Sequence, residues 1–141
     1  MEISELSDYS TETVERLNDL LFQLSPDIMQ ISQEYLSEIV NSDNVKLFVA
    51  RNNNLIVGTF TLVFYKIGSG YKASLEDVIV DDACKGQHIG KRMVEYAIKF
   101  ASRSGASQLD LTSGPTRIVA NALYQKLGFE KRDTNVYRLK L

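Results

Sequence analysis

The sequence predicts an α/β fold in which a central mixed, mostly antiparallel sheet carries helices on both faces. Two observations support this prediction. The first half contains three successive stretches with strand periodicity, and the second half alternates strand and helix patterns. A length of 141 residues suits one core, so we expect residues 1–141 to form a single domain.

The first half begins with a short predicted strand at residues 2–6. Two amphipathic helices follow, separated by the breaker "SPD" at 25–27, and their apolar residues are Val14, Leu17, Leu20, Leu21 and Leu24, then Ile31, Tyr35, Ile39 and Val40. From residue 45 the period changes to two. This predicts a hairpin over 45–65 and, after "GSG" at 68–70, a third antiparallel strand over 71–80.

The second half predicts a crossover unit. One helix face from residue 89 onward is apolar, and "SQLDLTS" after Gly105 has strand character, so the strands before and after this helix should be parallel. A further helix is predicted over 116–126, with Gly128 as its C-terminal cap. A last strand is expected to close the chain, with one face formed by Tyr137, Leu139 and Leu141.

Composition excludes several classes of protein. The formal charge of −2 gives no overall field for nucleic acid or an anionic membrane, so neither is an expected partner. Cys84 is the only cysteine, which excludes an internal disulfide and a cysteine-rich metal site and suits a reducing compartment. The acidic start and the lack of a long apolar run predict neither a signal peptide nor a membrane span. We therefore expect a cytoplasmic protein.

The segment "VDDACKGQHIGKRMV" at 80–94 places glycines and lysines directly before a helix. Backbone amides at a helix start attract anions, which indicates a phosphate compound. A P-loop is excluded because Lys85 and Arg92 occupy positions that need glycine and Ser or Thr. A Rossmann turn, with Asp110 as its acidic residue, and an ordinary turn with solvated lysines remain as alternatives.

Two motifs favour a different cofactor. "LEDVIVDDACKGQHIGKRMV" at 75–94 resembles the signature of the GNAT superfamily, the acyl-CoA-dependent N-acyltransferases. There a hydrophobic strand leads into an Arg-Gly-x-Gly-x-Gly-type loop and a helix. "NALYQKLGFEK" at 121–131 is similar to the family's Asn-x-x-x-Tyr helix followed by Leu-Gly-Phe. Both motifs occur in the family's order and on elements of the expected type.

The resemblance implies a GNAT-type fold with acetyl-CoA as co-substrate and no metal. It also implies a bulge in the strand before the loop, whose freed amides hold the pantetheine arm and the thioester carbonyl. The loop then binds the pyrophosphate, and the asparagine of the second motif touches the cofactor. The implied cofactor-binding residues are Val78, Ile79, Val80, Lys85, Gly86, Gln87, His88, Ile89, Gly90, Lys91 and Asn121.

His88 departs from the family pattern, which usually has glycine at this place. Histidine tolerates left-handed geometry better than a branched residue but adds a ring, which could weaken cofactor binding. Its alternatives are a solvent-exposed loop residue or, with Cys84, a thiol-protease pair. A pair on one loop without a third orienting group is poor support for proteolysis, and Cys84 is expected to be packed against its neighbours.

Acyl transfer requires a proton acceptor for the amine and a proton donor for the leaving thiolate. Glu76 lies on the strand just before the implied amide sites and is the candidate base, in a segment similar to that of glucosamine-6-phosphate N-acetyltransferases. Strand alternation places Asp77 on the opposite face. Tyr124 is the candidate acid, because this tyrosine is the usual general acid of the family. The alternatives are a solvent-facing strand carboxylate for Glu76 and a core aromatic for Tyr124.

Together these observations predict an N-acetyltransferase that moves an acetyl group from acetyl-CoA directly to a primary amine of a small molecule or peptide. A catalytically weakened acyl-CoA-binding or regulatory domain is the alternative, prompted by His88. The identity of the amine is not readable from the sequence. Edge strands at 45–65 or at the C-terminus are candidate contacts for a homodimer.

Overall fold

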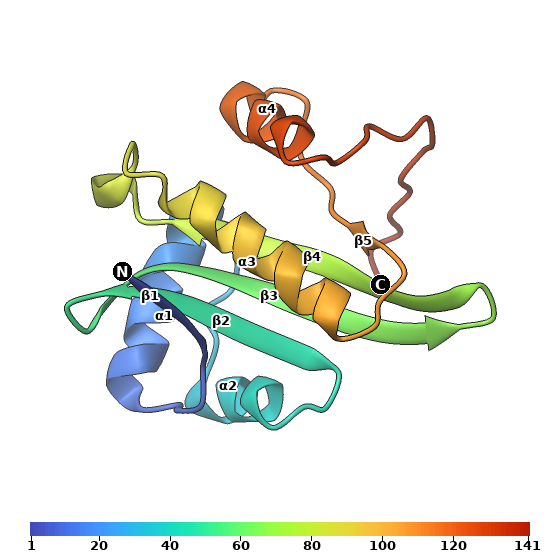
Figure 1. Cartoon of the computed structure of the whole chain (residues 1–141). Helices are drawn as coiled ribbons and strands as arrows, with labels where there is room; N and C mark the ends of the chain where they lie inside the picture. Colours follow the sequence, from blue (N-terminus) through green and yellow to red (C-terminus); the bar gives the residue numbers. More distant parts are fainter.

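A computed structural model describes residues 1–141 as a five-stranded sheet with four helices (Figure 1). The strands are β1 (Glu2–Glu5), β2 (Val45–Asn52), β3 (Leu55–Ile67), β4 (Gly70–Val80) and β5 (Leu109–Asp110), in the order β1-β2-β3-β4-β5. Only the β4–β5 pair is parallel. The helices are α1 (Thr11–Leu24), α2 (Gln33–Val40), α3 (Ile89–Arg103) and α4 (Ile118–Lys126), with a short 3₁₀ turn, η1 (Asp82–Cys84).

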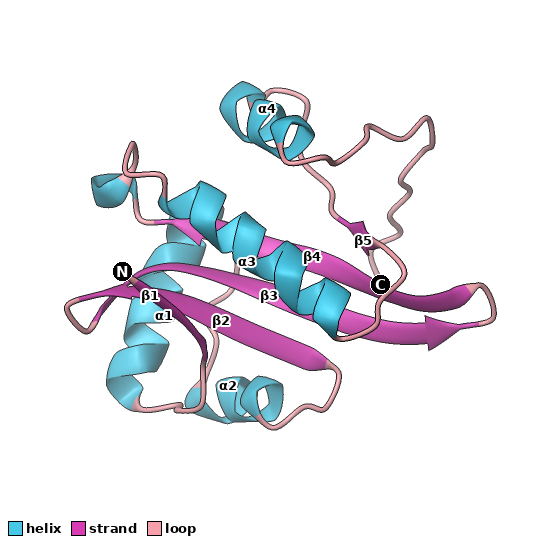
Figure 2. Ribbon diagram, viewed as in Figure 1, coloured by secondary structure: helices cyan, strands magenta, loops and turns pink.

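Helices α1 and α2 cover one face of the sheet and α3 covers the other (Figure 2). A serine caps the start of each of the first two helices. The hydroxyl of Ser10 accepts a hydrogen bond from the amide of Thr13 at 3.2 Å, and the hydroxyl of Ser32 accepts one from the amide of Tyr35 at 3.0 Å. Such caps satisfy amides that have no partner within the helix. The prediction of a mixed sheet with helices on both faces is confirmed.

The core has two apolar layers, one on each side of the sheet. The layer under α3 is centred on Phe48 and Phe60, whose rings stack at 5.0 Å, and on Met93 of α3. The other layer joins α1 and α2 to the sheet through fully buried leucines, among them Leu20 and Leu36. These layers fix the sheet between two sets of helices, and β4 contributes to both, with Leu75 in one layer and Ile79 in the other.

Helix α3 approaches β3 closely at Gly58. A Cβ atom at this position would lie 2.7 Å from the sulfur of Met93 and 3.0 Å from the carbonyl oxygen of Ile79. The glycine therefore sets the spacing between α3 and the sheet, because any side chain would push against a buried helix residue and a strand backbone.

At the edges of the sheet, one expectation holds over a shorter stretch than predicted and two are wrong. The strand after α3 does pair in parallel with β4, as predicted. The strand predicted from "SQLDLTS" is reduced to Leu109–Asp110, which pairs with Ala73 and Ser74 of β4. No strand forms near the C-terminus, where Tyr137, Leu139 and Leu141 are exposed, because alternation alone does not supply the backbone partner that a strand needs. Residues 45–65 do not form an edge, since β2 and β3 are interior strands and β1 and β5 are the edges.

No helix has both the length and the apolar character needed to cross a membrane.

Gly58→Ala is expected to lower the free energy of unfolding by about 1–3 kcal/mol, because overpacking a filled core costs about that much. Gly68→Ala is the matched control, since a Cβ atom there meets nothing within 4 Å. Urea unfolding followed by circular dichroism measures both variants. Equal stability of the two variants would contradict the close approach of α3 at Gly58.

Candidate active site

The candidate active site is organised by an irregularity in the middle of β4. Thr59 pairs with Ile79 and Thr61 pairs with Glu76, so the single residue Phe60 of β3 lies opposite Asp77 and Val78 of β4. This is a β-bulge, and Asp77 adopts a φ of 51°, in the left-handed region. Such a conformation costs of order 1–3 kcal/mol and persists only where the surrounding structure holds it. The bulge implied by the family resemblance is therefore present.

The opposite edge of β4 is open over the same stretch. Its pairing with β5 covers only Ala73 and Ser74, so from Leu75 to Val80 the strand has no partner on that side. Unpaired backbone groups at an open edge are available to an extended ligand. Val78, Ile79 and Val80 lie in this stretch and line a cavity beside it.

This cavity has a volume of about 810 Å³ and lies between β4, the loop before α3 and the inner side of α4. Its charged lining is mainly basic: Lys85, Lys91, Arg117 and Lys126 face a single acid, Asp82. We call it the cationic cavity. Of the predicted cofactor residues it collects Val78, Ile79, Val80, Lys85, Gly86, His88, Ile89, Gly90 and Lys91, whereas Gln87 and Asn121 do not line it.

The loop at one end of the cationic cavity has the geometry of an anion site. Gly86 has a φ of 83°, and His88 has a φ of 61° and directly precedes α3 without capping it through its side chain. Left-handed residues before a helix turn successive amides toward one point, and the first-turn amides of α3 have no intrahelical partner. His88 therefore occupies a backbone conformation that glycine adopts without strain.

An ion pair ties this loop to α1. Arg16 of α1 lies 2.5 Å from Asp81, the residue after β4, and its Nε also donates to the carbonyl oxygen of Ile56 at 2.7 Å. Gln23 of α1 accepts the amide of Asp82 at 2.8 Å and donates to Asp81 at 3.4 Å. The Arg16 guanidinium and the amide of Ala83 hold the pKa of Asp81 below its usual value. Sequence reasoning missed these contacts because the residues lie far apart in the chain.

Helix α4 brings Tyr124 to the cationic cavity. Tyr124 is buried, with 7% of its surface exposed, and its ring packs edge-to-face with Phe129 at 5.9 Å. Asn121 instead donates its side-chain amide to the carbonyl oxygen of Gly114 at 3.0 Å, which fixes the loop before α4. Ile118 is 75% exposed and lines the same cavity.

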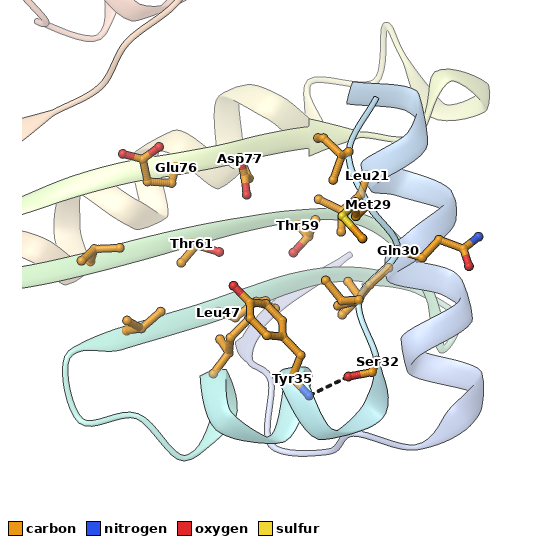
Figure 3. A pocket seen from close by; sticks show the side chains of 16 residues that line it. Leu21, Met29, Gln30, Ser32, Tyr35, Leu47, Thr59, Thr61, Glu76 and Asp77 are labelled. Carbon is orange, nitrogen blue, oxygen red and sulfur yellow. Dashed lines mark hydrogen bonds between the residues drawn. The ribbon is translucent and has the colours of Figure 1, made fainter. Parts of the chain in front are cut away.

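A second cavity, of about 760 Å³, lies on the other face of the sheet between α1, α2 and the strands (Figure 3). Its only charged lining residues are Glu76 and Asp77, and we call it the carboxylate cavity. The expectation that Asp77 points to the opposite face from Glu76 is wrong, because the bulge interrupts strand alternation. At the outer edge of the cavity, the Glu76 carboxylate accepts a hydrogen bond from the hydroxyl of Ser74 at 2.6 Å. The Asp77 carboxyl is directed toward β3 (Figure 3).

Asp77 is the site residue that sequence reasoning overlooked. Asp77 keeps an exposed surface, but its carboxyl is partly withdrawn from water beside the largely apolar wall. This partial burial raises the pKa of the carboxyl, and the negative charge of Glu76 raises it further. A carboxylate with a raised pKa is a better proton acceptor, and such groups gather at functional sites. The only signal in the sequence was the adjacent acid pair in "LEDV".

The chain belongs to the acetyltransferase (GNAT) family, whose profile matches residues 11–129. It is 28% identical over 131 residues to the IAA acetyltransferase of Azospirillum brasilense, covering 92% of this chain and 82% of that protein. It is also 28% identical over 118 residues to human N-acetyltransferase 8B, covering 82% of this chain. The match spans half the length of that human protein.

A solved structure with the same fold is a putative acetyltransferase from Agrobacterium tumefaciens. The two structures align with a TM-score of 0.87 over 99% of this chain and all of that one, at 20% sequence identity. The family and fold implied by the two sequence motifs are thus confirmed.

Asp81→Asn is expected to lower the free energy of unfolding by about 1–2 kcal/mol at pH 7, because the charge-assisted bonds to Arg16 and Gln23 are weakened. The pKa of Asp81 is depressed in the folded state, so its contribution is present above the unfolded pKa of about 3.9 and is lost as the pH falls through the folded pKa. Urea unfolding at pH 7 and pH 3 measures this difference.

Asp19→Asn serves as the control. It removes an exposed carboxylate from α1, the helix that carries Arg16 and Gln23. It should change stability little at either pH. An equal destabilisation by Asp81→Asn at both pH values would contradict an electrostatic role for the ion pair.

Proposed function

We propose that this protein is an N-acetyltransferase that moves an acetyl group from acetyl-CoA to a primary amine by direct attack. The observation that carries the proposal is the position of the two cavities. The cationic cavity and the carboxylate cavity are lined by adjacent residues of β4, Val78 to Val80 in one and Glu76 and Asp77 in the other. The thioester of acetyl-CoA and the acceptor amine can therefore meet at the bulge, each approaching from its own side of the strand.

The cationic cavity suits acetyl-CoA in its charge and backbone geometry. At one end, the loop amides can donate hydrogen bonds to a pyrophosphate and the lysines can offset its charge. The open edge of β4 offers unpaired backbone groups that can hydrogen-bond a pantetheine arm. An amide of Val78 to Val80 directed at the thioester oxygen would stabilise the negative charge that develops there during attack. The proposed cofactor residues are the strand segment 78–80, residues 85–91 of the loop and the first turn of α3, and Asn121, which acts through the loop at Gly114.

In the reaction the amine nitrogen bonds to the thioester carbonyl carbon, the carbon–sulfur bond breaks, and one proton leaves the nitrogen while another reaches the sulfur. For an alkyl amine of pKa about 10.4, the neutral form at pH 7 costs roughly 4.6 kcal/mol. Proton removal therefore has to be assisted. We propose Glu76 and Asp77 as the proton-accepting pair, with Asp77 as the member directed into the cavity.

Tyr124 is the proposed proton donor to the thiolate. A tyrosine of pKa about 10 and a thiol of pKa about 8.5 differ by only ~2 kcal/mol in proton affinity, so a hydrogen bond to sulfur can supply most of the stabilisation. Tyr124 lines the cationic cavity, in which the proposed thiolate would form.

The second candidate function is an acyl-CoA-binding domain without turnover, favoured by one observation. His88 has a left-handed backbone conformation and lines the cavity at the proposed pyrophosphate site, where the family usually has glycine. The cytosolic location and a homodimer also remain proposals. The free thiol of Cys84 and the open sheet edges β1 and β5 support them.

Calorimetric titration with acetyl-CoA, with NAD and ATP as controls, and turnover of amines by the wild type and Tyr124→Phe test the proposal. We expect micromolar binding of acetyl-CoA by both proteins, because the hydroxyl acts only on the leaving thiolate. Turnover should fall by roughly 10²-fold in Tyr124→Phe, the range typical for loss of a general acid. Binding without any turnover in the wild type would favour the second candidate function.

The acid side of the pH–rate profile should respond to the charge of Glu76. A base works only when deprotonated, so activity is lost as the pH falls through the pKa of Asp77, which lies above the ordinary value. Glu76→Gln removes one cause of that elevation and should move the acid limb to lower pH. Asp77→Asn should abolish the limb and lower kcat/KM by roughly 10²-fold.

Rates for this experiment are expressed per unprotonated amine, which removes the titration of the acceptor itself. Loss of the limb in Glu76→Gln, with an unchanged limb in Asp77→Asn, would assign the base to Glu76 alone.

A further inference from the structure

The carboxylate cavity has a composition that restricts what it can bind. Ten of its sixteen lining residues are hydrophobic, and they come from α1, α2, the segment between these helices, and the strands. Leu21, Tyr35 and Leu47 stand on three of these elements around the same space (Figure 3). A wall of this kind favours an apolar body over a hydrated one.

The charge of the lining residues restricts the class of ligand further. No lysine, arginine or histidine lines the cavity, and its two charged residues are both acids. A phosphate or carboxylate on the acceptor would meet no counter-ion and would be repelled by Glu76 and Asp77. A single ammonium group is attracted by the same pair. Sugar phosphates and free amino acids are therefore poorly matched to this wall.

Two of the four neutral polar residues in the wall, Thr59 and Ser32, are already hydrogen-bonded within the protein. The hydroxyl of Thr59 donates to the carbonyl oxygen of Phe48 at 2.8 Å, and the hydroxyl of Ser32 accepts the amide of Tyr35 at 3.0 Å. Thr61 and Gln30 are left for a ligand. A polyhydroxylated amine would leave most of its hydroxyl groups without partners, which costs binding free energy.

The rim of the cavity is unusually apolar for a surface. Met29 is 87% exposed and Tyr35 is 54% exposed, and Ile28 beside them is also exposed. Grouped apolar side chains at the mouth of a cavity mark a contact surface rather than scattered exposure. The rim and the acid pair both border the cavity, so one ligand can contact both.

We propose that the acceptor is a primary amine with one positive charge and an apolar aliphatic or aromatic body. Its ammonium group lies at Glu76 and Asp77, and its body lies against Tyr35 and Met29. This inference rests on the proposed N-acetyltransferase function and names the acceptor class for the same site.

A panel of amines tests the proposal, with release of the CoA thiol as the readout at saturating acetyl-CoA. The probes are 2-phenylethylamine and hexylamine as apolar monocations, glucosamine 6-phosphate and lysine as anion-bearing amines, and kanamycin as a polyhydroxylated polycation. We expect kcat/KM for the apolar monocations to exceed that for each other probe at least tenfold. Preference for any of the hydrophilic amines would overturn this inference and leave the proposed function standing. No turnover of any amine would overturn both.

Tyr35→Ala tests the position of the apolar body, with Tyr9→Ala as the matched control. Tyr35 is 54% exposed and Tyr9 is 41% exposed, so neither change disturbs the core. Only Tyr35 lines the carboxylate cavity. We expect Tyr35→Ala to raise KM for 2-phenylethylamine by roughly five- to tenfold while KM for acetyl-CoA and kcat stay within twofold. An unchanged KM, or the same rise in Tyr9→Ala, would overturn the placement.

Discussion

The bulge at Asp77 and Val78 is the constraint on which the rest of the site depends. It places two residues of β4 opposite one residue of β3, in a strand that has already lost its partner on the β5 side. Without the extra residue, alternation would send the side chains of Glu76 and Asp77 to opposite faces. With it, both carboxylates line one cavity, and the strand beyond them borders the other. The strain at Asp77 is held by the core layers that fix β4 from both sides.

The two cavities differ in charge because different elements build them. The cationic cavity draws its lysines and arginine from the loop before α3, the first turn of α3, the residue before α4 and the end of α4. The carboxylate cavity lies between α1, α2 and the strands and is lined by no basic group. Helix α1 contributes to both, through Leu21 on one side and Gln23 on the other. The contacts of Arg16 and Gln23 with the loop give the two sides a shared support. In the proposed function, the opposite charge on either side of one strand would separate an anionic co-substrate from a cationic acceptor.

Much of this arrangement could be predicted from local patterns. Helical spacing and period-two alternation predict α1 to α3 and β2 to β4, and the glycine-containing loop before α3 predicts an anion site. The bulge could not be derived from alternation, which assumes a regular strand, and so Asp77 was placed on the wrong face. The short β5 and the unpaired C-terminal segment depend on backbone partners that no local pattern supplies. The Arg16–Asp81 pair joins residues 65 positions apart, which a single sequence does not reveal.

Amide hydrogen exchange with and without CoA, followed by mass spectrometry, tests the proposed acyl-CoA site most directly. We expect CoA to increase the protection of two separate segments, the β4 edge at 78–80 and residues 86–90 at the start of α3, and NAD to change neither. Protection of the loop alone would show a phosphate site without a pantetheine groove. The absence of protection at both segments would contradict the proposal that the open edge of β4 and the loop before α3 together form one acyl-CoA site.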